Sequence, residues 1–323
     1  MTRFKRSSIA GAILGFLTPL SFGAADPIAA QAGAGHNHGG GSEADLKSGE
    51  FRSTPVITLE GHGGFENNLT SEGKPAHYAI DGLFGGVMEW GLPNQGSFAI
   101  EAAIGPALVW GEAEHFYGRV HLEDEEHGEH SDEEHGHGEG QPFRRIDMKG
   151  MLQARYQPND RLTLAATWLP YAVTRSQGED IQGVKHEINA GVTYAFGDGD
   201  VNFALGDGWD SVVDGLFVSV SNHTGWESDG VYVGNYTDTW AGFGFNYDQL
   251  SITLTGGPRF YSPGSSSGLS QRTDWGGEIA LEYPISDSVV AFAHWEAIYS
   301  TASGEGWGKG FQNHLGTGLS FRF

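Results

Sequence analysis

Most of this chain alternates between apolar and polar residues with a period of two. The last segment shows the pattern most clearly. One of its faces carries Leu315, Thr317, Leu319, Phe321 and Phe323, and the other carries His314, Gly316, Gly318, Ser320 and Arg322. Because successive side chains of a β-strand point to opposite faces of a sheet, this pattern predicts a strand with one apolar and one polar face.

Similar alternating segments recur along the chain, separated by turns and loops. They predict about twelve strands, within a range of about ten to fourteen, at 55–62, 76–90, 97–110, 143–157, 161–175, 185–197, 212–223, 236–247, 249–260, 273–284, 288–300 and 311–323. The connections alternate between short turns and longer loops, except for a long turn at 197–211. The longer loops are predicted at 63–75, 111–142, 176–184, 224–235, 262–272 and 301–310.

The length of these segments separates two all-β folds. A soluble β-sandwich has strands of about 5–6 residues, whereas most of these segments have the length that crosses a bilayer with tilt. Aromatic residues gather at the ends of the apolar face, as in transmembrane barrels: Trp90, Trp110, Tyr156, Trp168, Tyr194, Phe196, Tyr247 and Tyr283. The pattern therefore predicts an antiparallel transmembrane β-barrel.

The N-terminus has the form of a secretory signal peptide. A basic stretch at 2–6 precedes an apolar run from Ile9 to Phe22, and small residues that suit cleavage follow. The predicted organisation is a signal peptide at 1–30, a flexible Gly- and His-containing segment at 31–53, and the barrel at 54–323.

Over the barrel region the chain resembles the Gram-negative outer-membrane proteins. In that class a final alternating strand that ends in Phe is the signal for barrel assembly, and here the strand runs from His314 to Phe323. The resemblance implies an outer-membrane location. The even strand count, with the short turns on the periplasmic side, predicts that both termini are in the periplasm. The resemblance also implies two partners, outer-membrane lipid and the barrel-assembly machinery, while homo-oligomerisation is left open.

Composition excludes several function classes. The chain has 41 acidic and 18 basic residues and a net charge of −23, which argues against nucleic acid as a partner. It has no cysteine, so disulfides, thiolate ligands and thiol catalysis are absent. The 51 glycines suit a β protein with many turns.

The predicted extracellular loop at 111–142 is rich in metal-ligand side chains. Between 112 and 139 it has six His and eleven acidic residues against one base. Imidazole and carboxylate groups together are ligands for Zn²⁺ and related divalent ions. The candidate ligands are His115, His121, His127, His130, His135, His137, Glu125, Glu126, Glu133 and Glu134, with His36 and His38 as a second cluster on the periplasmic side.

This loop resembles the His-rich loops of zinc transporters and metal chaperones. The whole chain is similar to porin-like outer-membrane proteins made under zinc limitation. The resemblance implies capture and passage of divalent ions, with zinc as cargo rather than as a structural cofactor. Two alternatives remain: a general diffusion porin and a structural barrel, each with an acidic loop that only keeps the surface solvated.

The polar face of the strands offers a second set of candidates. His294, Glu296 and His314 are predicted on adjacent strands facing the lumen, where they could relay a cation. Ser221 with His223 is a candidate hydrolase pair, and Asp229, Asp238 and His223 a candidate protease set. No catalytic motif accompanies them, so the sequence predicts that the chain is not an enzyme.

Overall fold

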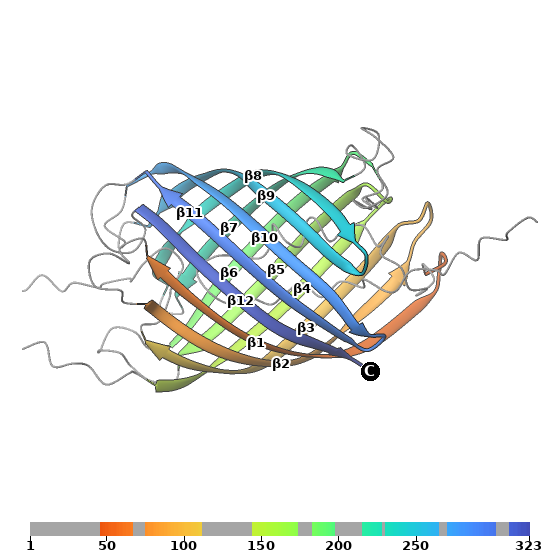
Figure 1. Ribbon diagram of the computed structural model, residues 1–323, viewed down its shortest axis with the longest axis horizontal. Coiled ribbons are helices and arrows are strands. Elements are labelled where there is room, and N and C mark those ends of the chain that lie inside the picture. The colour runs from red at the N-terminus through yellow and green to blue at the C-terminus, as the bar shows by residue number, and fades with distance from the viewer. Residues whose placement is uncertain are drawn as a thin grey trace, which may run out of the picture.

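The computed structural model describes residues 46–66, 75–111, 144–173, 183–197, 215–227, 230–264, 270–301 and 310–323. Within these ranges twelve antiparallel strands form one closed barrel (Figure 1). The strands are β1 (Phe51–Glu66), β2 (Pro75–Gly91), β3 (Ser97–Gly111), β4 (Arg144–Gln157), β5 (Leu162–Val173), β6 (Gly183–Ala195), β7 (Leu216–Glu227), β8 (Tyr232–Tyr247), β9 (Leu250–Pro263), β10 (Arg272–Ser286), β11 (Val289–Ser300) and β12 (Gly310–Arg322).

The predicted all-β class and the count of twelve strands are confirmed, and most strand ends fall within a few residues of the prediction. Three strands differ most. β1 was predicted at 55–62 and extends four residues further at each end, β7 was predicted at 212–223 and lies four residues later, and β8 begins four residues before its predicted start at 236. Only residues 228–231 separate β7 from β8. Polar side chains bond across the β7–β8 pair: Asn222 Nδ2 donates to Thr237 Oγ1 at 2.8 Å, and Asn235 Nδ2 donates to Thr224 Oγ1 at 2.7 Å.

The barrel closes where its first and last strands pair. The register runs from Val56 opposite Arg322 to Glu66 opposite Gln312, and the amide of Phe323 also donates to the carbonyl of Pro55. A closed barrel leaves no sheet edge with unpaired backbone groups, which is a requirement for strands that cross a bilayer. We call the end with the start of β1 and the end of β12 the short-turn end, and the opposite end the long-loop end.

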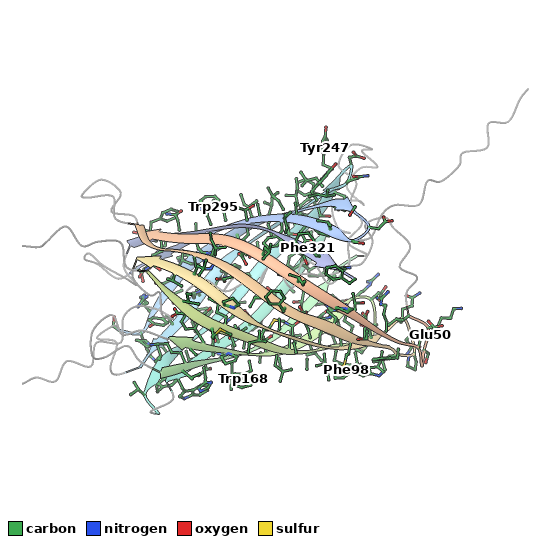
Figure 2. All side chains as sticks on the ribbon, turned by 90° about the horizontal axis from the view of Figure 1, so that it is seen from below. Glu50, Phe98, Trp168, Tyr247, Trp295 and Phe321 are labelled. Atoms are coloured by element: carbon green, nitrogen blue, oxygen red, sulfur yellow. The ribbon has the colours of Figure 1, made fainter. Side chains whose placement is uncertain are left out.

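Polarity in this barrel is inverted relative to a soluble protein. Large apolar side chains cover the outside, where Ile104 is 61 % exposed and Trp275 is 58 % exposed, whereas Asp147 and Arg259 are fully buried inside. Figure 2 shows Trp168, Trp295 and Tyr247 projecting outward from the ribbon. An apolar exterior around a polar interior is the arrangement of a membrane barrel.

Aromatic side chains lie on the outside near both ends of the barrel. At the short-turn end Phe51, Trp90 and Phe98 stand in a row, with ring centroids 5.1 and 5.5 Å apart. At the long-loop end Trp226 and Tyr232 are 6.2 Å apart. These positions correspond to the two interfaces of a bilayer, where amphipathic rings are enriched. Across the described ranges, no helix is long and apolar enough to cross a membrane.

The depth of each outward residue predicts how much a charge there costs. Ile104 lies in the middle of β3, and Ile146 lies near the long-loop end of β4. We expect Ile104→Arg to lower the free energy of unfolding by about 2–4 kcal/mol and Ile146→Arg by about 0–1 kcal/mol. Urea unfolding in lipid vesicles measures both, and equal costs would contradict the assigned membrane level.

Candidate functional site

A cluster of three histidines lies inside the barrel and spans its closure. His314 Nε2 is 3.2 Å from His62 Nδ1 across the β12–β1 pair, and the rings of His294 and His314 are stacked with centroids 5.4 Å apart. All three side chains are buried. Because β1 and β12 are the two ends of the barrel sequence, the closed sheet brings these residues together from opposite ends of the chain.

A glycine makes room for this cluster. Gly316 on β12 faces inward, directly opposite His294 on β11. A Cβ atom at Gly316 would lie 2.2 Å from the His294 ring and 2.6 Å from Glu60 Oε1, so any larger residue would displace them. With glycine at this position, His294 Nε2 and Glu60 Oε1 approach to 3.8 Å.

Acidic and basic groups extend the cluster in one direction. Asp81 Oδ2 lies 3.1 Å from His62 Nε2 and accepts a 2.6 Å bond from Lys149 Nζ. The Lys149 ammonium also lies 5.6 Å from the centroid of the Tyr171 ring, whose hydroxyl donates to Asp147. These contacts carry the polar network from β1 through β2 and β4 to β5.

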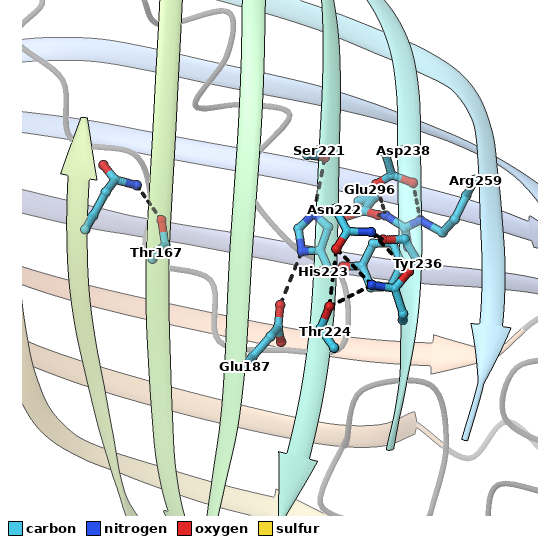
Figure 3. Close-up of polar contacts among 12 residues, drawn as sticks. Thr167, Glu187, Ser221, Asn222, His223, Thr224, Tyr236, Asp238, Arg259 and Glu296 are labelled. Carbon is cyan, nitrogen blue, oxygen red and sulfur yellow. Dashed lines mark hydrogen bonds and ion pairs between the residues drawn. The ribbon is translucent and has the colours of Figure 1, made fainter. Parts of the chain in front are cut away.

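Arg259 connects the network in the other direction. Its guanidinium donates to both carboxylate oxygens of Asp238, at 2.6 and 2.7 Å, and to Glu296 Oε1 at 3.2 Å (Figure 3). It also lies over the Tyr236 ring, 4.2 Å from its centroid. Tyr236 in turn stacks on His223, with centroids 4.2 Å apart and the ring planes nearly parallel. Arg259 thus joins β11, β9, β8 and β7.

We call the inward-facing charged and histidine residues of this network the lumen belt, together with Glu187, which contacts His223, and Glu278, which pairs with Glu296 across β10 and β11. It consists of Glu60, His62, Asp81, Asp147, Lys149, Glu187, His223, Asp238, Arg259, Glu278, His294, Glu296 and His314. The belt has seven carboxylates and two permanently cationic side chains, so it is strongly acidic when its histidines are neutral. Such a wall lowers the energy of cations and raises that of anions.

The sequence-predicted site residues fall into two groups. His294, Glu296 and His314 are all in the belt, and Glu296 faces His314 across β11 and β12. Within the described ranges, no group of three or more His, Asp or Glu side chains is arranged to hold a metal ion. The other candidates lie outside the described residues: His36, His38, His115, His121, Glu125, Glu126, His127, His130, Glu133, Glu134, His135 and His137.

Sequence reasoning missed the β1 and β2 members of the belt. Glu60 and His62 lie in a glycine-rich stretch that was predicted to end at 62, and Asp81 lies next to a glycine. Glycine gives no polarity signal, so the inward face of these two strands was obscured. Thr58, Glu60 and His62 are polar residues at alternate positions, and the apolar Ile57 and Leu59 alternate with them. This alternation is the signal that could have identified the inward face of β1.

Comparison with known proteins supports the architecture. Residues 203–323 match a family model described as a cyanophage outer membrane protein like β-barrel domain. The match includes β7 to β12, which is less than half of the chain. No curated protein matches the sequence.

Several solved structures of other outer-membrane proteins are similar to this chain at low identity and low TM-score. The translocator domain of the autotransporter NalP from Neisseria meningitidis is 10 % identical, covers 92 % of this chain and 94 % of its own, and has a TM-score of 0.41. The NanC porin is 8 % identical, with coverages of 83 % and 100 % and a TM-score of 0.40. Outer membrane phospholipase A from Escherichia coli is 11 % identical, with coverages of 83 % and 89 % and a TM-score of 0.33.

The Arg259 contacts predict a large effect on stability. Arg259→Met leaves Asp238 and Glu296 as buried carboxylates without their cation, and we expect it to cost about 3 kcal/mol or more. Arg52→Met is the matched control, because the Arg52–Glu89 pair is partly exposed and is worth about 1 kcal/mol or less. Urea unfolding compares the two, and a cost for Arg259→Met no larger than the control would show that the belt pairs do not stabilise the barrel.

Proposed function

We propose that this protein is a porin-like barrel of the outer membrane that captures divalent metal ions, above all zinc, and passes them across the membrane. The observation that carries the proposal is the lumen belt, in which seven carboxylates and four histidines face two permanent cations. A ring of acidic side chains favours cations in a pore, and imidazole adds a preference for zinc over hard cations such as Mg²⁺.

The spacing of the belt suits passage rather than storage. His62, His294 and His314 contact one another in pairs, and neighbouring carboxylates are bonded to Lys149 or Arg259. An ion that moves along such a wall meets successive weak ligands and no closed coordination shell. Conduction requires this balance, because each site must release the ion it attracts.

The His-rich loop favours passage of ions from outside the cell to the periplasm. With the termini in the periplasm, the segment 111–142 faces outside the cell, and between 112 and 139 its formal charge is −10, from eleven acids and one Arg. It would raise the local concentration of cations at the entrance. His36 and His38 would receive them on the periplasmic side.

The belt histidines predict a specific change in zinc permeability. In planar bilayers with zinc on one side and potassium on the other, we expect the double substitution His294→Asn and His314→Asn to lower the zinc-to-potassium permeability ratio about tenfold. A loss of about 1.4 kcal/mol in ion binding has this effect. The reversal potential measures the ratio.

The matched control for this experiment is His186→Asn. His186 lies on the outside of the barrel, where Trp168 Nε1 donates to its Nδ1 at 3.3 Å, so its loss should leave the ratio unchanged. An unchanged ratio in the double variant would instead favour a general diffusion porin. The absence of any conductance in the intact protein would favour a structural barrel.

We expect the histidine side chains of the loop to bind zinc, and calorimetry measures this binding. We expect heat on zinc titration of the intact barrel, with a dissociation constant in the micromolar range, and its loss on deletion of residues 123–137. A second variant replaces His127, His130, His135 and His137 with Asn and keeps every acid. Binding that survives in this variant would assign the loop an electrostatic role alone.

A further inference from the structure

A serine, a histidine and a glutamate form a linked set on the lumen wall. His223 Nε2 lies 3.2 Å from Ser221 Oγ, and His223 Nδ1 lies 3.2 Å from Glu187 Oε1 (Figure 3). Ser221 and His223 are two residues apart on β7, so both point inward, and Glu187 reaches them from the neighbouring strand β6.

The chemistry of the three groups fixes which atom carries the proton on a neutral His223. An ionised carboxylate can only accept a hydrogen bond, so Nδ1–H donates to Glu187. Nε2 then has its lone pair toward Ser221 and accepts from the hydroxyl. A serine that donates to an imidazole, itself oriented by a carboxylate, is the arrangement that activates a hydroxyl as a nucleophile.

The imidazole is held in place by its surroundings. Tyr236 on β8 stacks face to face on His223, at 4.2 Å between centroids and 4° between planes. Arg259 lies 4.2 Å from the Tyr236 ring centroid. His223, Tyr236 and Arg259 are almost completely buried. The stacking restricts rotation of the imidazole, so both of its hydrogen bonds are kept in the same plane.

A buried amide beside the set has no hydrogen-bond partner among the described residues. Asn189 on β6 faces His223 across the strand pair and is 1 % exposed. Within the described part of the chain, neither its amide nitrogen nor its amide oxygen makes a hydrogen bond. Leaving such a group unsatisfied costs about 1–3 kcal/mol. A substrate oxygen would accept from Nδ2, the role of an oxyanion-stabilising donor.

We propose that Ser221, His223, Glu187 and Asn189 form a hydrolase site for short-chain, water-soluble carboxylic esters that enter the lumen. Ser221 Oγ attacks the carbonyl carbon while His223 Nε2 takes its proton, and Asn189 Nδ2–H donates to the carbonyl oxygen. The ester bond breaks, His223 returns the proton to the departing alcohol, and Ser221 is acylated. Water then gives a proton to His223 and its hydroxyl to the acyl carbon. The bond between the acyl carbon and Ser221 Oγ breaks, His223 returns the proton to Oγ, and the carboxylic acid is released.

A hydrolase site departs from the sequence-based prediction that the chain is not an enzyme. The site shares Glu187 and His223 with the lumen belt but does not require passage of metal ions. The site lies inside the barrel, and this position limits the substrates that it can meet. Ser221 is 4 % exposed, it pairs with Gly191 on β6, and both residues face the lumen. The substrate class is therefore set by what enters the barrel, and membrane lipid on the outside does not reach the serine.

The experiment uses the folded full-length barrel in detergent micelles with a fluorophosphonate probe and p-nitrophenyl acetate. We expect a covalent adduct on Ser221, found by peptide mass spectrometry, and ester hydrolysis that saturates. Ser221→Ala and His223→Gln should abolish both. Ser219→Ala is the matched control, because Ser219 is also buried and inward-facing on β7, two residues before Ser221; it should keep both.

The roles of Asn189 and Glu187 are tested separately through kcat and KM. Asn189→Ala should lower kcat about 100-fold or more, the usual effect of losing an oxyanion donor. Glu187 is a positioning residue, so Glu187→Gln should lower kcat with little change in KM, and Glu187→Asp should recover part of the loss. Absence of an adduct on the unmodified protein, or labelling that persists in His223→Gln, would overturn the proposal without dependence on how any Ser221 variant folds.

Discussion

Backbone hydrogen bonding in a solvent that offers no partners is the constraint on which this structure depends. In hydrocarbon each unpaired amide or carbonyl costs several kcal/mol, so a sheet that enters a bilayer must have no open edge. The pairing of β1 with β12 meets that requirement. Once the cylinder is closed, the period of two in the sequence divides every strand into a lipid face and a lumen face, and all later features follow from this division.

Charge is confined to the lumen, and there it must be paired. Arg259 meets two carboxylates and Lys149 meets Asp81, because an ionised group without a partner is costly when it is buried. Acids exceed permanent bases in the belt, and histidines lie between them. The side chains whose ion pairs stabilise the interior therefore also determine how strongly it attracts cations. Towards the short-turn end, acids and bases are more evenly matched, as in the Arg52–Glu89 pair.

The sequence predicted the fold better than the site. Alternation and strand length are local signals, so the twelve strands and the final strand ending near Phe323 could be predicted without knowledge of long-range contacts. The site depends on register between strands. Glu296 opposite His314 could be anticipated because β11 and β12 are adjacent in sequence, but His62 joins them only through closure. Ser221 and His223 were considered, whereas the approach of Glu187 and the unpaired amide of Asn189 depend on the pairing of β6 with β7.

The position of the histidine cluster also bears on the order of events during biogenesis. His62 belongs to the first strand and His314 to the last, so their rings meet only when β1 pairs with β12. A partly inserted chain, with its two edge strands still apart, lacks this contact however complete its other hairpins are. The interior thus acquires its complete histidine cluster at the moment when the wall becomes continuous. The contact between His62 and His314 is therefore a marker of a closed barrel.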